Sequence, residues 1–213
     1  YFRLVFSAYR ALRRAGLSVD FFSAKDIPAD YSVILAPGLA TMDPDLEHRL
    51  AERCDLAILG PRSGAITRDF QIPEKGRPGL SRIDCDVDLV ETLPPTVERA
   101  VKGGGAARHW IDRLSGTAKD LLSFEDGTSA LKAGDGIWYL AGFPDEDLWD
   151  RVIAMAAEEA DLTLRTMPQG LRLRETANHD FLINYNAGPV EWNGLTVQGC
   201  DVKILKRTPP EQT

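Results

Sequence analysis

A serine beside an arginine lies in a glycine-rich turn that follows an apolar run. The segment LAILGPRSGAIT, residues 56–67, places Arg62, Ser63 and Gly64 directly after a strand-like stretch. The pattern is close to the nucleophile elbow Gly-x-Ser-x-Gly, in which a strand-to-helix turn exposes a serine above a sheet. Here the serine stands directly before the second glycine, so the spacing differs from that of the elbow. The turn could hold a nucleophile, an anion bound by backbone amides and Arg62, or only the corner of a sheet.

The residues that such a nucleophile needs are hard to find in the sequence. A catalytic serine requires a histidine base that is held by an acid. The chain has three histidines, His48, His109 and His179, and each lies in a polar or glycine-rich context typical of a solvated surface residue. The Lys-Ser/Thr pair of a phosphate-binding Walker loop is absent from the turn. We therefore predict no catalytic residue, and we interpret the turn as a structural corner or an interface loop.

Clustered acids and scattered cysteines are the usual signs of a metal site. Asp84, Asp86 and Asp88 alternate along one predicted strand, with Glu91 beyond them, and we interpret them as a solvated acidic edge that discourages edge pairing. A calcium loop would need a glycine at a defined turn position and a closing bidentate acid. The three cysteines have no zinc or disulfide spacing. The sequence therefore predicts no metal, no cofactor and a reducing, cytoplasmic location.

Trp192 keeps a sugar-binding hypothesis open. It lies in the turn-like segment PVEWNG and is the best candidate for an exposed aromatic ring. The other tryptophans stand at strand or helix positions, where core packing is the default. A carbohydrate-binding module that uses Trp192 is therefore one alternative function.

Composition excludes two classes of partner. The formal net charge is −7, and the lysines and arginines are scattered among acids. Phosphate neutralisation needs clustered cations, so we expect no nucleic acid partner. The apolar runs fall far short of the roughly 20 residues that span a bilayer, so we expect no membrane partner. The chain opens on YFRLVF with no initiator Met, and we expect it to be a piece of a longer protein.

The first 60 residues alternate between helical and strand patterns. Apolar residues at helical spacing (Phe2, Val5, Phe6, Tyr9 and Leu12) predict an amphipathic helix that ends at Gly16. LSVDFF, YSVILAP and DLAILG predict strands, and Asp43 and Pro44 predict the start of a helix that runs to about Arg53. This order predicts a parallel sheet covered by helices, with its first strand expected before Tyr1.

Later segments read as hairpins, one helix and a run of strands. AKDLLSFEDG, TSALKAG and GIWYLAG predict antiparallel strands joined by Asp-Gly and Gly-Asp-Gly turns. An apolar stripe from Leu148 predicts a helix that ends near Ala160, and strand patterns follow to the end of the chain. We predict two domains, residues 1–165 and 166–213.

Four segments together resemble a known family. FRLVFSAYRALRRAGLSVDFF, YSVILAPGLATMDPDL, AILGPRSGAITRDFQIPE and IWYLAGFPDEDLW look like the region that follows the catalytic barrel in glycoside hydrolase family 42 β-galactosidases. QGLRLRETANHDFLINYN resembles that family's small C-terminal β-domain. The resemblance implies an α/β, flavodoxin-like parallel sheet flanked by helices, similar to class I glutamine amidotransferases, followed by a small antiparallel β-domain.

The same resemblance implies a function for the chain. In this family the barrel hydrolyses β-galactosides with two glutamates, and the middle domain is the trimerisation domain. The expectation is a non-catalytic assembly region, inactive by itself, whose partners are the parent barrel and the neighbouring subunits of a homotrimer, with substrate met through the barrel. Arg62, Ser63, Gly64 and Phe70 are the candidate interface or substrate-wall residues. A serine-dependent or amidotransferase-like hydrolase centred on Ser63 is the alternative enzyme.

Overall fold

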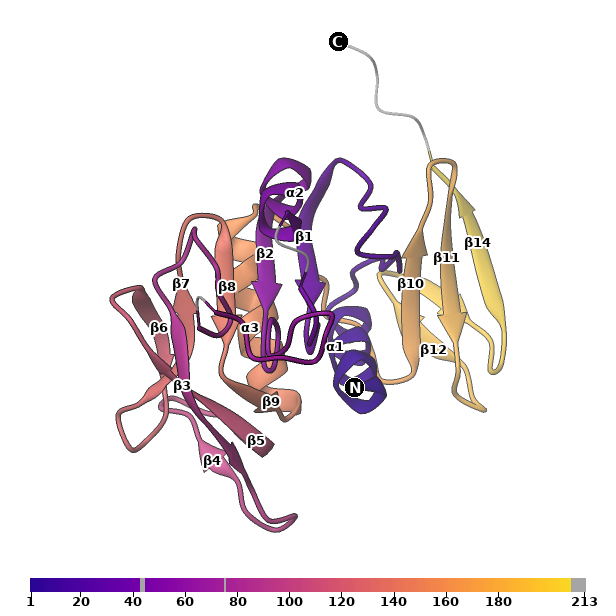
Figure 1. The fold of residues 1–213 in the computed structure, drawn as a ribbon. Helices are drawn as coiled ribbons and strands as arrows, with labels where there is room; N and C mark the ends of the chain where they lie inside the picture. Colours follow the sequence, from indigo (N-terminus) through magenta and orange to yellow (C-terminus); the bar gives the residue numbers. More distant parts are fainter. Residues whose placement is uncertain (43–44, 75, 208–213) are drawn as a thin grey trace. The chain divides into compact units, whose positions relative to one another are not determined.

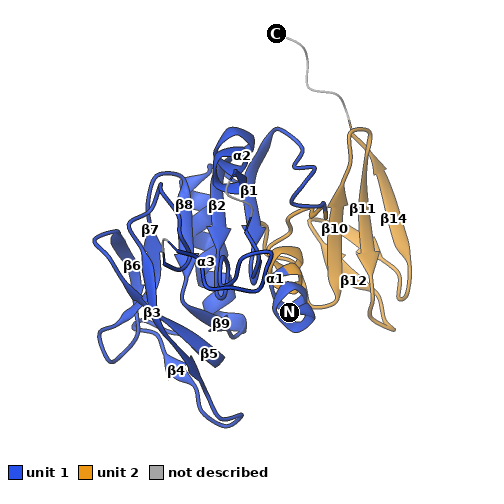
Figure 2. Cartoon of the chain, viewed as in Figure 1, with its two compact units in different colours: residues 1–8, 22–162 blue, residues 9–21, 163–213 orange. Residues whose placement is uncertain are grey.

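The structure of the chain is a computed structural model that describes residues 1–42, 45–74 and 76–207. The chain divides into two compact units, drawn in different colours in Figure 2. Unit 1 comprises residues 1–8 and 22–162, and unit 2 comprises residues 9–21 together with the chain from residue 163 onward. Each unit is therefore assembled from two separate stretches of sequence.

Most elements of unit 1 are strands (Figure 1). In chain order they are α1 (Phe2–Arg14, whose second half belongs to unit 2), β1 (Tyr31–Ala36), α2 (Leu46–Arg53), β2 (Cys54–Leu59), β3 (Asp86–Thr92), β4 (Arg99–Ala100), β5 (Ala106–Ser115), β6 (Lys119–Ser123), β7 (Ser129–Ala133), β8 (Ile137–Leu140), β9 (Gly142–Pro144) and α3 (Glu146–Glu159).

The central sheet of unit 1 is mixed. Its strand order is β1-β2-β8-β7-β6, in which β1, β2 and β8 pair in parallel and β7 and β6 are added antiparallel. A second, antiparallel sheet has the order β3-β5-β4, and β9 also pairs with β5. The predicted flavodoxin-like parallel sheet flanked by helices is wrong, because strands dominate the described chain and most of their pairings are antiparallel.

One predicted strand is absent where the parallel sheet was expected to continue. LSVDFF, residues 17–22, has no regular secondary structure. It is joined to a later strand by bonds that each use one side chain: the Ser18 hydroxyl accepts from the Glu175 backbone amide at 2.8 Å, and the Arg174 guanidinium donates to the Val19 carbonyl at 2.9 Å. Side-chain bonds have thus replaced a strand ladder, and the alternating pattern of LSVDFF gave no sign of this.

The turn chemistry of the later segments predicted their strands correctly. The Asp-Gly turn joins β6 to β7, and the Gly-Asp-Gly turn joins β7 to β8, with antiparallel register in both hairpins. The predicted helix after Pro144 is α3, whose N-cap Asp145 accepts from the Leu148 amide at 2.8 Å. Its apolar stripe is buried, as the spacing predicted.

The first two helices differ from their predictions in detail. Helix α1 ends before Gly16 as predicted, but it buries Leu4, Ala8 and Ala11 and leaves Phe2 84% exposed. The apolar residues chosen from the sequence therefore include the outer side of the helix. Helix α2 begins at Leu46, and the predicted start at Asp43 and Pro44 lies outside the described residues.

Unit 2 is built from short antiparallel strands. They are β10 (Leu171–Glu175), β11 (His179–Asn184), β12 (Val190–Trp192), β13 (Leu195–Val197) and β14 (Val202–Lys206). Strands β10, β11 and β14 form one sheet, and β12 and β13 form a hairpin. A small core holds them together, made by Leu171, Leu173, Leu182 and Val197.

The core of unit 1 fixes the end of strand β2, where the serine turn begins. Leu46 and Leu50 of α2 pack with Ala57 and Leu59 of β2 in one buried cluster, which also includes Tyr139 of β8. Leu59 and Tyr139 are fully buried. Burying a leucine side chain contributes roughly 1.5–3 kcal/mol, so the strand end that precedes Gly60 is firmly anchored.

Candidate functional site

The turn after β2 has an unusual backbone that its glycines make possible. Gly60, Arg62 and Gly64 all have positive φ, at 75°, 67° and 65°. At Gly64 an added Cβ would lie 2.5 Å from the Pro78 carbonyl oxygen, and at Gly60 it would meet the Leu140 carbonyl. Only glycine fits where backbones approach this closely in a left-handed conformation. The turn is therefore packed against two other segments.

Ser63 is committed to the backbone of this turn. Its side chain is buried, with 1% of the residue exposed. The hydroxyl oxygen accepts from the Gly60 amide at 2.8 Å and the hydroxyl donates to the Ala36 carbonyl at 3.1 Å. A nucleophile must give its proton to a base and reach a substrate. Ser63 does neither in this arrangement, so the alternative of a serine hydrolase has no support.

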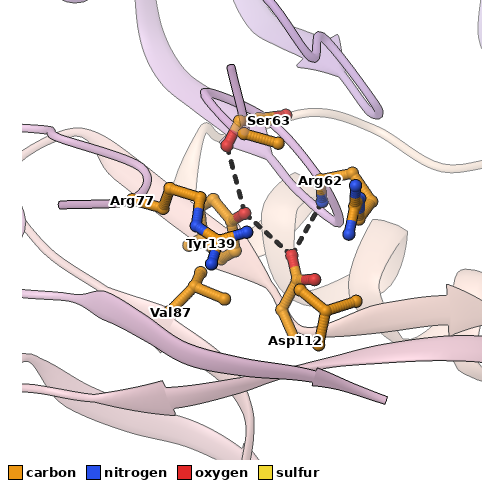
Figure 3. Close-up of a pocket in the computed structure, with 8 residues that line it drawn as sticks. Arg62, Ser63, Arg77, Val87, Asp112 and Tyr139 are labelled. Atoms are coloured by element: carbon orange, nitrogen blue, oxygen red, sulfur yellow. Dashed lines mark hydrogen bonds between the residues drawn. The ribbon is translucent and has the colours of Figure 1, made fainter. Parts of the chain in front are cut away.

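A buried carboxylate that the sequence analysis missed holds the turn from the other side. Asp112 of β5 is 1% exposed, and its Oδ2 accepts from the Arg62 amide at 2.7 Å and from the Tyr139 hydroxyl at 3.0 Å (Figure 3). The Tyr139 hydroxyl also lies 3.3 Å from the Ser63 carbonyl oxygen. Asp112 thus ties the second sheet of unit 1 to the turn and to the central sheet.

Burial changes the acid-base chemistry of both partners. Desolvation raises the pKa of Asp112, while the bonds from the Arg62 amide and the Tyr139 hydroxyl partly offset that rise. Desolvation, and next the charge of Asp112, raise the pKa of Tyr139 well above its ordinary value. Perturbed acids often mark active sites. Here the carboxylate is enclosed by its own chain, which makes it a structural latch.

A small pocket opens beside this latch. Its lining includes Arg62, Arg77, Val87, Asp112 and Tyr139, and it has no room for a water molecule. Ligand pockets usually enclose roughly 300–1,000 Å³, so this pocket is too small for a whole sugar or cofactor.

Phe70 lies on a tight turn just beyond the glycines. The Thr67 amide donates to the Gln71 carbonyl at 2.8 Å, and the Gln71 amide donates to the Thr67 hydroxyl at 3.1 Å. Phe70 has a φ of 58° and is 83% exposed, and Ile72 beside it is 68% exposed. A bulky residue with positive φ is a genuine outlier. The turn presents an aromatic side chain to solvent from a fixed backbone.

The remaining candidates are dispersed. His48 is exposed and pairs with Glu52 at 3.1 Å, whereas the ring of His109 packs edge-on against Phe143. His179 is the first residue of β11. In the ranges that the structure describes, no group of three His, Cys, Asp or Glu side chains is arranged to hold a metal ion.

The other candidate motifs have structural roles in the chain. Asp84, Asp86 and Asp88 are exposed around β3, which is an edge strand, as predicted. Trp192 is half-buried against the core of unit 2, and its Nε1 donates to the Thr166 carbonyl at 3.1 Å. The sugar-platform hypothesis for Trp192 therefore has no support.

Burial affects the chemistry of two of the cysteines, Cys54 and Cys85. Desolvation raises the pKa of Cys54 to about 11 and that of Cys85 to about 12, so both are thiols near neutral pH. The likeness to glutamine amidotransferases is not supported. No described helix is long and apolar enough to cross a bilayer.

Comparison with known proteins identifies the family. Residues 1–163 match the model of the beta-galactosidase trimerisation domain, so the chain belongs to that family. A beta-galactosidase of Thermus thermophilus is 34% identical over 199 residues, which are 90% of this chain and 30% of that protein. Beta-galactosidase BgaH of Haloferax lucentense is 27% identical, over 85% of this chain and 30% of the relative.

Solved structures contain the same fold. A beta-galactosidase of the psychrophilic Marinomonas ef1 matches 98% of this chain with a TM-score of 0.91 and 29% identity, over 34% of its own chain. A beta-galactosidase of Bacillus circulans sp. alkalophilus matches 98% with a TM-score of 0.88 and 19% identity, over 38% of its own chain. The chain thus spans about a third of the length of the proteins it resembles.

Proposed function

We propose that this chain is the non-catalytic assembly region of a larger β-galactosidase and that it helps to hold the subunits of that enzyme in a trimer. The observation that carries the proposal is the match of residues 1–163 to the trimerisation-domain family. The small share of each relative that the chain covers adds support, because it leaves room for a catalytic domain in a protein of that size.

Hydrolysis of the β-galactoside belongs, in this proposal, to the parent barrel. Retaining hydrolysis needs two carboxyl groups about 5 Å apart on either side of the scissile bond. Two acids of unit 1 are engaged in ion pairs: Glu91 and Asp126 both pair with Arg99 and Arg113. Substrate would meet this chain only through the neighbouring barrel.

Domain division and location complete the proposal. We assign residues 1–165 to the assembly domain and residues 166–213 to a small β-domain. The strands that follow residue 165 support this division, and the compact units depart from it by placing residues 9–21 and 163–165 with the second unit. A cytoplasmic location is supported by three cysteines that form no disulfide. Neither the domain division nor the location affects how the subunits would assemble.

The turn at Phe70 is our candidate for the subunit contact. Its aromatic side chain is exposed on a backbone that is held by the bonds between Thr67 and Gln71. Rigid aromatic anchors dominate interface energetics, because they bury a large area and lose little conformational entropy. Arg62, Ser63 and Gly64 fix the preceding turn, and Arg62 adds a charged group.

The test is the oligomeric state of the parent β-galactosidase. Phe70→Ala should raise the trimer dissociation constant about thirtyfold, the effect of roughly 2 kcal/mol that an aromatic anchor contributes. Tyr185→Ala, which removes an exposed aromatic ring of unit 2, is the matched control. Analytical ultracentrifugation over a dilution series would measure both. A monomeric wild-type enzyme would refute the assembly function, and equal dissociation of all three proteins would remove Phe70 from the interface.

A further inference from the structure

The hairpin of β12 and β13 turns at Asn193 and Gly194, a pair of residues that can react with each other. They form a two-residue loop between Trp192 and Leu195, which lie opposite each other in the register. Both have positive φ, at 49° and 73°. Positive φ at both central residues is the signature of a type I′ turn, for which Asn-Gly is a preferred pair. The turn has thus placed an Asn-Gly sequence at the surface of unit 2.

The backbone nitrogen of Gly194 is open to solvent chemistry. Both residues of the turn are exposed, and an added Cβ at Gly194 would meet no atom within 4 Å. Among the described residues, neither the Gly194 amide nor the Asn193 side chain has a hydrogen-bond partner. A peptide nitrogen that has lost its proton can attack the side-chain amide carbon of a preceding asparagine. Because glycine has no side chain, nothing shields that nitrogen here.

The other asparagines of the chain each lack at least one of these features. Asn178, Asn184 and Asn186 are followed by histidine, tyrosine and alanine, respectively. Asn184 is 2% exposed, and its side-chain amide bonds to four backbone groups. The Asn186 side chain donates to a backbone carbonyl at 2.8 Å. Asn178 is exposed, so the residue that follows it distinguishes it from Asn193.

We propose that Asn193 is a site of spontaneous deamidation, which converts it into aspartate and isoaspartate. The Gly194 nitrogen gives its proton to base and bonds to Cγ of Asn193, and the side-chain nitrogen leaves as ammonia. Water then opens the succinimide ring. Opening at the side-chain carbonyl gives aspartate, and opening at the main-chain carbonyl gives isoaspartate. One amide and one water become a carboxylate and an ammonium ion, without an oxidant or a reductant.

Ring closure requires the hairpin to open briefly, because the succinimide holds the Asn193 backbone outside the left-handed region that the turn imposes. Strands β12 and β13 are three residues long each and pair only with one another in the described chain. A two-stranded hairpin is marginally stable by itself. Such segments open locally while the rest of a protein stays folded. The reaction therefore proceeds from the folded protein.

The two products should affect unit 2 differently. Isoaspartate adds one carbon to the backbone of a two-residue turn, so the pairing of Trp192 with Leu195 cannot persist unchanged. Both of these side chains pack against the core of unit 2, and Trp192 Nε1 donates to the Thr166 carbonyl at 3.1 Å. Aspartate keeps the backbone and adds only a negative charge. Isoaspartate should therefore loosen the hairpin, and aspartate should leave it in place.

The experiment follows fragment masses of the parent β-galactosidase during incubation at mildly acidic and mildly alkaline pH. Glutamyl endopeptidase cleaves after Glu175 and Glu191, which places Asn193 on a different fragment from the other three asparagines. The Asn193 fragment should gain about 1 Da and separate into two products. Its rate should rise about tenfold per pH unit, as the deprotonated amide does. Asn193→Gly, which keeps a type I′ turn, should show no gain.

Two results would overturn the proposal. Deamidation of Asn178 as fast as that of Asn193 would show that the Asn-Gly turn confers no reactivity. Deamidation of Asn193 in the urea-unfolded protein alone would show that the folded turn prevents the reaction. Hydrogen exchange of residues 190–197 tests the consequence: it should be faster in the isoaspartate form than in Asn193→Asp, and equal exchange would refute the loosening of the hairpin. None of these measurements depends on assembly of the trimer.

Discussion

Replacing Asp112 should release the turn that carries Arg62 and Ser63. Asp112→Ala removes the acceptor for the Arg62 amide and the Tyr139 hydroxyl, two buried donors at 2.7 and 3.0 Å from Oδ2. Each buried donor without a partner costs about 1–3 kcal/mol, so the loss of both should destabilise this region by about 2–6 kcal/mol. The turn would then open far more often while the rest of unit 1 stays folded.

Asp112→Asn is the matched variant, because its amide oxygen can still accept both bonds. Burial raises the pKa of Asp112, so the folded state holds its proton more tightly than the unfolded state does. The stabilising contribution of that proton is fully present below the ordinary carboxyl pKa and is lost as the pH rises through the raised folded pKa. The free energy of unfolding of Asp112→Asn, taken relative to that of the wild type, should therefore be higher at pH 7 than at pH 4.

Hydrogen exchange of the parent protein measures the effect where it arises. The peptide covering residues 57–66 should exchange about thirtyfold faster or more in Asp112→Ala, as a loss of 2 kcal/mol or more implies. Asp112→Asn should show a much smaller change, and urea unfolding at pH 4 and pH 7 would test the pH dependence. Wild-type protection of this peptide in Asp112→Ala would refute the latch.

Two further changes test the description of each unit. Asn184→Ala should destabilise unit 2 by about 2–4 kcal/mol, because it removes a buried side-chain amide that bonds to four backbone groups. This amide donates to the Gly188, Val197 and Gln198 carbonyls and accepts from the Asn186 amide. Thermal unfolding measures the loss, and an unchanged unfolding transition would contradict it. Asp126→Asn should destabilise unit 1 at neutral pH. The bonds from Thr128, and next those from Arg113, lower the pKa of Asp126 to about 2, so the penalty should shrink as the pH falls from about 4 towards 2. Urea unfolding at pH 7 and pH 3 measures it, and a pH-independent penalty would speak against that assignment.

Local chemistry predicted the local elements well. The Asp-Gly and Gly-Asp-Gly turns identified the hairpins of β6, β7 and β8, because these turn types fix an antiparallel return. The apolar stripe from Leu148 identified α3 in the same way. These signals are read from neighbouring residues, so a single sequence contains them.

Pairing between distant segments was not predictable in the same way. A short apolar run such as YSVILA suits a parallel sheet and a mixed sheet equally, so the sequence could not exclude the antiparallel additions that overturn the flavodoxin-like assignment. The backbone conformation of LSVDFF depends on bonds to strand β10, which lies far along the chain.

For the candidate site, too, the part formed by neighbouring residues was predictable and the part contributed by distant residues was not. The glycines identified the turn at Ser63, but its latch Asp112 lies 50 residues away from Arg62 in sequence. Asp112 had no clear signal, since in the sequence it only stands beside Arg113. Arg77 had none, since its place beside Asp112 follows from how Pro78 packs on Gly64.

Unit 2 is built from two separate stretches of sequence, so it cannot be completed until the second stretch has been synthesised. Residues 9–21 are synthesised long before β10. Arg174, whose guanidinium donates to the Val19 carbonyl, follows Val19 by 155 positions in the sequence. At roughly 5–20 residues per second, the ribosome needs about 8–31 s to cover that distance. During this time the segment lacks the strand that binds it, and its apolar side chains are open to chaperones and to other nascent chains. The polypeptide that emerges early in this chain is therefore among the last to reach its final place.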